Sequence, residues 1–325
     1  MIRRLENILE ALESEGISLQ RKPEKLSGGI NSNVFKLKTT SDEKLVLKIY
    51  PASSKLDARE RRVTEKTFLE LVNDHGISNT PRIVQSVSSL NYSLLSWIDG
   101  ESIKSLNNDY IRQIAKFITD LQIKIPFYKR QQLPLASEAI TGLTEFKANL
   151  QNRFKSINSV VPQTKLDLEI QGWIRDKLDA ALKRELAALN YCLGEGAWSN
   201  DKQICTFASP SDVGIHNTLA NEKGLFFYDF EYAGRDDISK LIADWVAQPN
   251  YPLNEAQELL LVEEVLKNLC NSYYPSDWIY RYQSIKNLIT IKWILIMLRK
   301  YKEGNIKLVD WEKIMNYARL RNSCL

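Results

Sequence analysis

The first third of the chain alternates apolar and polar residues with the two-residue period of a β-sheet. Residues 44–50, Lys-Leu-Val-Leu-Lys-Ile-Tyr, follow this period throughout. Because successive side chains of a strand point to opposite faces, Val46 and Lys48 share one face, and the aliphatic residues between and beside them share the other. Residues 92–100 have the character of a further strand that ends in a glycine turn. These patterns predict an antiparallel sheet.

Helical spacing of apolar residues dominates the rest of the chain. Helices are predicted for residues 110–123, 144–157 and 166–193, and Leu5, Ile8, Leu9 and Leu12 predict an amphipathic helix at the N-terminus. Short apolar runs at 204–208 and 225–228 indicate buried strands, and the polar, proline-punctuated span 124–137 is the best candidate for a mobile loop. We expect an α+β fold with an N-terminal lobe, residues 1–96, and a mainly helical lobe, residues 97–325.

Three polar side chains that follow the predicted buried strands have the spacing of a phosphoryl-transfer site. Asp212 is followed by Asn217 five residues later, and Asp229 lies twelve residues beyond Asn217. Phosphoryl transfer needs one carboxylate that accepts the proton of the attacking hydroxyl, and an amide and a second carboxylate that hold Mg²⁺ against the phosphates of ATP. Asp and Asn also cap turns in ordinary loops, and the triplet alone would favour that structural interpretation. Its position after two strands favours the chemical one.

A candidate phosphate-binding turn lies at residues 27–33, Ser-Gly-Gly-Ile-Asn-Ser-Asn. Gly28 and Gly29 carry no side chain that would keep phosphate oxygens away from the backbone N–H groups. With Ser32 and Asn33 they form the predicted nucleotide-binding turn. A Gly-Gly turn often only joins a hairpin, so this signal gains weight from the strand that follows.

That strand supplies a candidate phosphate-binding lysine. Val46 would cover the adenine while Lys48 reaches the phosphates. A carboxylate must hold such a lysine in place, and the next predicted helix offers Glu60, Glu65 and Glu70. We choose Glu65 because helical spacing places it beside the apolar Phe68 and Leu69, whereas Glu60 belongs to a charged run.

On these residues, above all SPSDVGIHNTL at 209–219 and YDFEYAG at 228–234, the chain resembles the aminoglycoside phosphotransferase and choline kinase superfamily. The resemblance extends from about residue 26 to residue 245, and it implies a bilobal protein-kinase-like fold and an enzyme that uses ATP and Mg²⁺. It also implies the roles of individual residues: Asp212 as catalytic base, Asn217 and Asp229 as magnesium ligands, Lys48 and Glu65 as an ion pair, and Ser96 and Ile98 within the adenine hinge.

The chain departs from the superfamily pattern near the predicted base and after the metal loop. Pro210-Ser211 replaces the usual His-Gly, and Gly214 stands where a histidine is usual, with His216 two residues later. We expect these changes to reshape the loop while they leave its three chemical groups in place. Lys240 stands where relatives often carry an aspartate, and our hypothesis is that Asp244 covers its structural role.

Composition narrows the remaining classes. A net charge of +4 is too small to argue for a nucleic-acid partner. Four cysteines without metal-ligand spacing, and two histidines, predict reduced thiols, no zinc site and a cytoplasmic location. Residues 288–298 are too short to span a membrane and contain Lys292, so they predict a buried helix and no membrane partner. The oligomeric state stays open.

The acceptor is expected to be a small hydroxylated molecule. A protein kinase would carry Phe-Gly after the metal aspartate, whereas Asp229 is followed by Phe230-Glu231. Residues 251–325 hold 11 Lys or Arg against 8 Asp or Glu, which disfavours a polycationic aminoglycoside. Choline or ethanolamine is an alternative, because Trp278, Tyr280, Tyr282 and Trp293 could wall an ammonium group, although helix packing is the preferred interpretation of these aromatic residues.

A sugar or another neutral metabolite is the first choice of acceptor. A nucleotide-binding regulator without turnover is the alternative from another class. Degenerate kinases commonly lose the lysine, the base or a metal group, and this sequence retains all of them.

Overall fold

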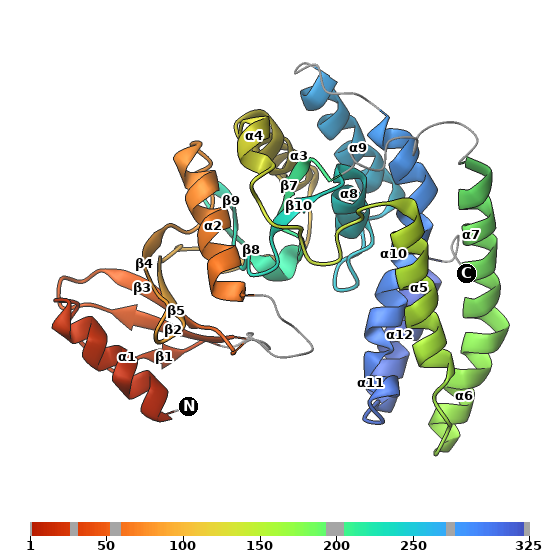
Figure 1. Ribbon diagram of the computed structural model, residues 1–325, viewed down its shortest axis with the longest axis horizontal. Helices are drawn as coiled ribbons and strands as arrows, with labels where there is room; N and C mark the ends of the chain where they lie inside the picture. Colours follow the sequence, from red (N-terminus) through yellow and green to blue (C-terminus); the bar gives the residue numbers. More distant parts are fainter. Residues whose placement is uncertain (1, 27–31, 53–59, 193–204, 271–276, 322–325) are drawn as a thin grey trace.

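The computed structural model of the chain describes residues 2–26, 32–52, 60–192, 205–270 and 277–321. A five-stranded sheet near the N-terminus lies at one end of the molecule, and a bundle of long helices lies at the other (Figure 1). Two small sheets and further helices occupy the centre, between these ends. The elements predicted to carry the chemistry come from this centre and from the adjoining face of the N-terminal sheet.

The N-terminal sheet is entirely antiparallel. Its order is β1 (Glu24–Lys25), β2 (Asn33–Lys38), β3 (Lys44–Ile49), β5 (Tyr92–Ser96) and β4 (Ile83–Val87). The aliphatic residues of β3 lie in a core with Ile8 and Leu12 of helix α1 (Ile2–Ser14), as the sequence predicted. Val46 and Lys48 occupy the opposite face of β3, which is the face toward the rest of the molecule.

Helix α2 (Arg61–Asp74) joins the sheet to the helical part of the molecule. Its apolar residues Phe68, Leu69 and Val72 are fully buried and belong to the larger core, which continues into the C-terminal helices. Figure 1 shows α2 between the N-terminal sheet and the central elements. A side chain on the sheet-facing side of α2 therefore lies where the two parts of the molecule meet.

Two small sheets form the centre. β6 (Glu101–Ser102), β8 (Thr218–Asn221) and β9 (Gly224–Phe227) make one of them, and β7 (Phe207–Ser209) pairs antiparallel with β10 (Gly234–Asp236) in the other. A 3₁₀ turn, η4 (Ile215–Asn217), connects β7 to β8. The predicted strand at 204–208, whose first residue lies outside the described residues, overlaps β7, which ends one residue later. The predicted strand at 225–228 corresponds to β9, which begins and ends one residue earlier.

The helices around the centre are largely those that the sequence predicted. α3 (Asn108–Ile123) packs beside α9 (Glu255–Cys270), and the fully buried α8 (Ile238–Val246) packs beside α10 (Trp278–Met297). The bundle at the far end contains α5 (Leu143–Asn158), α6 (Lys165–Trp173), α7 (Asp179–Cys192), α11 (Arg299–Lys302) and α12 (Leu308–Leu320), together with α10 (Figure 1). Residues 288–298 fall in α10 as a buried helix. Among the helices described, none has the combination of length and apolar character that a membrane span requires.

One predicted helix differs in detail. The stretch 166–193 forms α6 and α7 with a π-helical turn, η1 (Ile174–Leu178), between them. Ile170, Ile174 and Leu178 recur every four residues and are all fully buried. In a helix of 3.6 residues per turn such a repeat drifts by about 40° at each step. The wider turn offsets this drift and keeps the three side chains on one face.

The span predicted to be a mobile loop, residues 124–137, contains a short helix, α4 (Phe127–Arg130), and the start of a segment, residues 133–140, which we name the strap. The strap runs along β10: Arg235 N donates to Pro134 O at 2.8 Å, and Ala136 N donates to Arg235 O at 3.0 Å. A Cβ at Gly234 would lie 2.4 Å from Pro134 O, so only glycine admits the strap at this distance. The sequence interpretation missed these hydrogen bonds because they join residues about a hundred positions apart.

Candidate active site

The loop between β7 and β8, residues 209–217, presents the predicted base and is called here the Asp212 loop. It brings two of the three predicted groups together: Asn217 Nδ2 donates to Asp212 O at 3.0 Å. The third is adjacent, because the N–H of Tyr228, the residue before Asp229, donates to Asn217 O at 3.1 Å. The pairing of β8 with β9 sets this juxtaposition, since Thr218 lies opposite Phe227. These bonds place Asp212, Asn217 and the residue before Asp229 side by side, and their chemical roles stay predictions.

The histidine of this loop lies against the predicted base. His216 Nε2 is 3.3 Å from Asp212 Oδ1, and about a third of each side chain is exposed. The backbone of Gly214 has a φ of 145°, and a Cβ there would lie 2.7 Å from His216 Nδ1. The absence of a side chain at position 214 thus makes room for the ring of His216. This accounts for the displaced histidine that the sequence pattern revealed.

Lys48 projects from β3 into a group of carboxylates. Its Nζ lies 2.7 Å from Glu65 Oε2, 2.5 Å from Asp229 Oδ1 and 3.3 Å from Glu231 Oε2. Burial alone would lower the pKa of Lys48, but Glu65 and Asp229 outweigh it and raise that pKa well above its ordinary value. The lysine is therefore fully charged and shared among three acids.

The structure pairs Lys48 with the glutamate that helical spacing selected. Glu65 is almost fully buried on α2, whereas Glu60 precedes the helix and is exposed. Glu65 also accepts hydrogen bonds from Tyr50 Oη at 2.8 Å and from Phe230 N at 3.0 Å. Burial raises the pKa of Glu65, against the opposing pull of Lys48. The glutamate thus ties β3 and α2 to the segment that follows Asp229.

Glu231 is a site residue that the sequence analysis did not select. It is buried, and its carboxylate accepts from Ser32 Oγ at 2.8 Å and from Arg61 Nη1 at 2.7 Å. Through these bonds Glu231 links Ser32 of the predicted nucleotide-binding turn and Arg61 at the start of α2 to the segment that follows Asp229. The sequence contained one signal that could have identified Glu231: it lies two residues after Asp229, in a run that is otherwise apolar and aromatic.

The donor set suits a divalent cation. Carboxylate oxygens of Glu65, Asp229 and Glu231 lie within 4.8 Å of one another. Oxygen ligands, usually one or two carboxylates and the phosphates of a nucleotide, are what Mg²⁺ prefers. Only Asp229 of the three has an appreciable exposed fraction, 35% of its side chain. Asn217 uses its Nδ2 on Asp212, and no described residue donates to its Oδ1. Asp229 and Asn217 are therefore the groups that could hold the ion.

The predicted nucleotide contacts line the same region in part. Asn33 begins β2, and Val46 lies on the face of β3 that carries Lys48; Ser32 turns its hydroxyl toward Glu231. Gly28 and Gly29 lie outside the described residues. Ser96 uses both its N–H and its hydroxyl on Arg82, each at 2.9 Å. The backbone of Ile98 bonds to no described residue, which leaves it as the better placed of the two hinge residues.

The aromatic residues considered for a choline site do not converge within the part of the chain that the structure describes. Trp278 and Tyr282 are buried in the core, and Tyr282 Oη donates to Glu258 at 2.7 Å. Tyr280, on the opposite side of α10, is largely exposed. Trp293 donates from Nε1 to Asp244 at 3.0 Å. Helix packing therefore accounts for most of this set.

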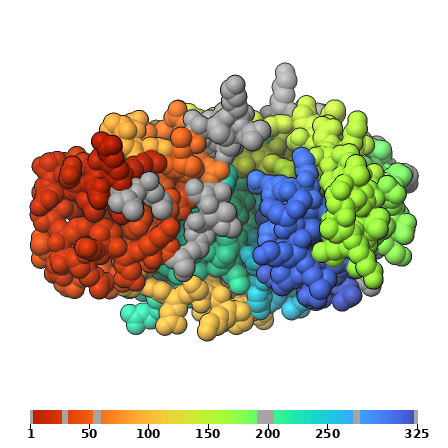
Figure 2. All heavy atoms as spheres, turned by 90° about the horizontal axis from the view of Figure 1, so that it is seen from below, coloured from red at the N-terminus to blue at the C-terminus, as the bar shows by residue number. Residues whose placement is uncertain are grey.

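Figure 2 shows teal atoms, the colour of the segment that contains the Asp212 loop, between the red N-terminal region and the blue C-terminal helices. A buried lysine–glutamate pair beside a second carboxylate, with a partly exposed aspartate on a nearby loop, is typical of phosphotransferases of the kinase-like class. The sequence profile of the phosphotransferase enzyme family (APH) matches residues 23–256, so the chain belongs to this family. The resemblance and the enzyme class that the sequence predicted are confirmed.

Solved structures show the same fold. A choline kinase from Cryptosporidium parvum superposes with a TM-score of 0.64 at 16% identity, over 98% of this chain and 96% of that one. An ethanolamine kinase from Plasmodium vivax superposes with a TM-score of 0.61 at 16% identity, over 96% of this chain and 85% of that one. An aminoglycoside phosphotransferase from Alicyclobacillus acidocaldarius superposes with a TM-score of 0.64 at 12% identity, over 95% of this chain and 92% of that one. These likenesses confirm the bilobal kinase-like fold. No curated protein sequence matches the chain significantly.

Proposed function

We propose that this protein transfers the γ-phosphoryl group of ATP to a hydroxyl of a small molecule, a sugar or another neutral metabolite. The observation that carries this proposal is the convergence of Lys48, Asp229, Asn217 and Asp212 along one cleft. Family membership adds the reaction class, because the family consists of phosphotransferases. A spectinomycin phosphotransferase of the same fold, solved in complex with ADP, supports an adenine nucleotide as the donor.

The residues divide the chemistry between them. Asp212, partly exposed on the loop, accepts the proton of the acceptor hydroxyl as its oxygen attacks the γ-phosphorus and the bond to the ADP oxygen breaks. Lys48, oriented by Glu65, binds the phosphate oxygens. Asp229 and Asn217 would hold Mg²⁺, which would neutralise charge on the phosphates. The backbone of Ile98 and the side chain of Val46 receive the adenine.

A neutral acceptor suits the charge of the C-terminal region, because residues 251–325 hold 11 Lys or Arg against 8 Asp or Glu. A polycationic aminoglycoside would need unpaired carboxylates in its place. Choline and ethanolamine remain the second candidates, because kinases named for these substrates share the fold.

The test is acceptor-dependent release of ADP from ATP and Mg²⁺, with a library of hydroxylated metabolites that includes choline, ethanolamine and an aminoglycoside. Asp212→Asn should keep the thermal shift produced by ATP with Mg²⁺ and should lower turnover by about 10²–10⁴-fold, because the base contacts the acceptor and not the nucleotide. Asp179→Asn, a similarly exposed aspartate on α7, serves as the matched control and should behave like the wild type.

Comparable turnover by Asp212→Asn would contradict the role of the base. A wild-type protein that binds ATP with Mg²⁺ but releases no ADP with any acceptor would instead favour the nucleotide-binding regulator. Preference for choline or for the aminoglycoside would overturn the neutral acceptor while the reaction class stands.

A further inference from the structure

The Asp212 loop has an unusual backbone that needs external support. Ser211 has a φ of 66° and Gly214 a φ of 145°, and these two residues bracket Asp212 and Val213. A non-glycine residue at positive φ is unfavourable and persists only where its surroundings impose it. Ser211 Oγ donates to Ser137 O of the strap at 2.9 Å, which supports the loop at its start. The turn after Asp212 requires a separate support.

Three successive carbonyls of that turn each accept a hydrogen bond from a different side chain. Asp212 O accepts from Asn217 Nδ2 at 3.0 Å, and Gly214 O accepts from Thr218 Oγ1 at 2.9 Å. Both donors belong to the same short stretch of chain. Val213 O, between them, accepts from Nε2 of Gln248 at 2.9 Å, and Gln248 is 35 residues away. Of the three, only Gln248 ties the turn to another part of the molecule.

The amide of Gln248 is fixed in one orientation. The residue is buried, and its Oε1 accepts from the N–H of Asn250 at 2.9 Å while its Nε2 donates to Val213 O. A flipped amide would set donor against donor and acceptor against acceptor at both ends. Gln248 also contacts Gly214, where an added Cβ would lie 2.8 Å from its Cγ. The side chain therefore determines where the Val213–Gly214 peptide lies.

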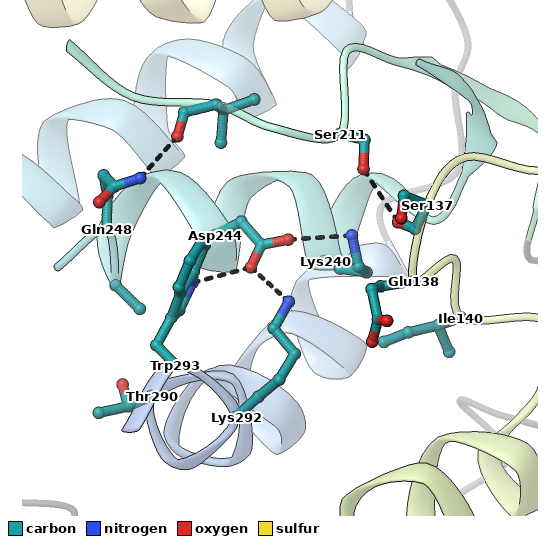
Figure 3. Close-up of polar contacts among 12 residues, drawn as sticks. Ser137, Glu138, Ile140, Ser211, Lys240, Asp244, Gln248, Thr290, Lys292 and Trp293 are labelled. Carbon is teal, nitrogen blue, oxygen red and sulfur yellow. Dashed lines mark hydrogen bonds and ion pairs between the residues drawn. The ribbon is translucent and has the colours of Figure 1, made fainter. Parts of the chain in front are cut away.

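The element that carries Gln248 is itself anchored. One helical turn earlier, the buried Asp244 accepts from Lys240, from Lys292 and from Trp293 Nε1 (Figure 3). These bonds join α8 to α10, and none of them reaches the Asp212 loop. Asp244 thus anchors α8, and its proposed cover for the aspartate missing at position 240 stays a prediction; the contact with the loop is made by Gln248, which follows the end of α8.

We propose that Gln248 is a positioning residue for phosphoryl transfer. It holds the Val213–Gly214 turn so that the Asp212 carboxylate and the Asn217 amide face the cleft together. The inference rests on the proposed function, because it assumes that Asp212 and Asn217 act on the acceptor and the metal. It adds a residue outside the loop, whose side chain donates a hydrogen bond to a backbone carbonyl there.

Two substitutions test the bond without a change of size. Gln248→Met keeps the length of the side chain and removes the donor. Gln248→Glu keeps the shape, still accepts from Asn250 N–H, and sets a carboxylate oxygen against the carbonyl of Val213. Gln171 on α6 is the matched control, since it is also buried and its Nε2 donates to the backbone oxygen of Val160 at the same 2.9 Å. Gln171→Met and Gln171→Glu lose an equivalent bond far along the chain from the loop.

The first readout is amide hydrogen exchange of peptides that cover residues 210–218, which needs neither ATP nor an acceptor. Exchange there should become faster in both Gln248 variants and stay unchanged in both Gln171 variants. The second readout is steady-state kinetics with the best acceptor of the metabolite library. For Gln248→Met we expect kcat to fall about tenfold, equivalent to about 1.4 kcal/mol, with little change in the KM for ATP. The kcat of Gln248→Glu should fall further than that of Gln248→Met.

The proposal is overturned if Gln248→Met shows the same loop exchange and the same kcat as Gln171→Met. In that case Gln248 is an ordinary packing residue. A rise in KM for ATP that accounts for the whole fall in kcat/KM, with kcat unchanged, would also overturn it, since that result indicates weaker binding of the nucleotide and not a misplaced base. If the wild type turns over no acceptor, the proposed function fails, and the exchange measurement still decides whether Gln248 holds the loop.

Discussion

Replacement of Lys48 by methionine should destabilise the fold strongly, although it removes a polar group from the interior. Lys48 is the ammonium shared by Glu65 and Glu231, whose side chains are 1% and 2% exposed. Loss of one partner of a buried ion pair costs about 3–5 kcal/mol, because the other charge stays buried. Arg61 still pairs with Glu231, and Tyr50 still donates to Glu65, so we expect the lower end, about 3 kcal/mol at pH 8.

The loss of folding stability in Lys48→Met should depend on pH, and the pKa of Glu65 determines whether it grows or shrinks as the pH rises. Burial already raises the pKa of Glu65, and Lys48 opposes that rise. Without Lys48 the pKa of Glu65 in the folded state should rise further, and each added unit is worth about 1.4 kcal/mol. A carboxyl group with a raised pKa in the folded state favours folding below its ordinary pKa, and this contribution is lost as the pH rises through the raised value. The variant should therefore lose more stability at pH 8 than at pH 5.

Urea unfolding of the wild type and the variants at both pH values measures this. Lys44→Met is the matched control on the same strand: Lys44 pairs with Asp99 at 2.8 Å, but both side chains are exposed, so its loss should cost about 0–1 kcal/mol. A double variant with Glu65→Gln should be much less destabilised than the sum of the two single changes. If Lys48→Met matched Lys44→Met at pH 8, or lost equal stability at both pH values, the shared ion pair would not have the assigned role.

Two further changes test the metal group and the strap. Asp229→Asn tolerates the positive φ of 67° and should abolish the magnesium-dependent part of the ATP thermal shift; a surviving shift would place the metal ligand elsewhere. Gly234→Ala should destabilise by about 1–3 kcal/mol in urea, because the new Cβ meets backbone atoms of the strap that no rotamer change can move away. Gly172→Ala, in α6 with no atom within 4 Å of the new Cβ, should stabilise by about 0.5–1 kcal/mol, and equal effects at both glycines would refute the steric reasoning.

Local periodicity explains which parts of the fold and site could be predicted. The face of β3 that carries Lys48, and the choice of Glu65 over Glu60, follow from two- and four-residue spacings that a few neighbouring residues determine. The same reasoning separates Tyr280 from Trp278 and Tyr282, since positions two apart on a helix face different ways. Helical spacing alone removes Tyr280 from the aromatic wall considered for choline, whereas the burial and hydrogen bonds of the other residues appear only in the structure.

The missed features depend on residues that meet only in the folded chain. Ser32 and Glu231 bond across 199 positions, Ser211 and the strap across 74, and Gln248 and Val213 across 35. Nothing in the period of a segment specifies a partner at such separations. The strap illustrates this limit: the polar, proline-punctuated span 124–137, in which it begins, is typical of a loop, and the backbone bonds that fasten it come from β10.

The three carboxylates around Lys48 also bear on which form of the nucleotide the protein accepts. A polyphosphate that arrives without a counterion meets one ammonium, already neutralised, and a surplus of fixed negative charge from Glu65, Asp229 and Glu231. If the proposed function holds, a divalent ion bound with the phosphates would offset this repulsion, because it would give Asp229 a new partner and leave Lys48 available to the oxygens. We therefore expect the site to favour metal-complexed nucleotide, with free nucleotide a poor competitor.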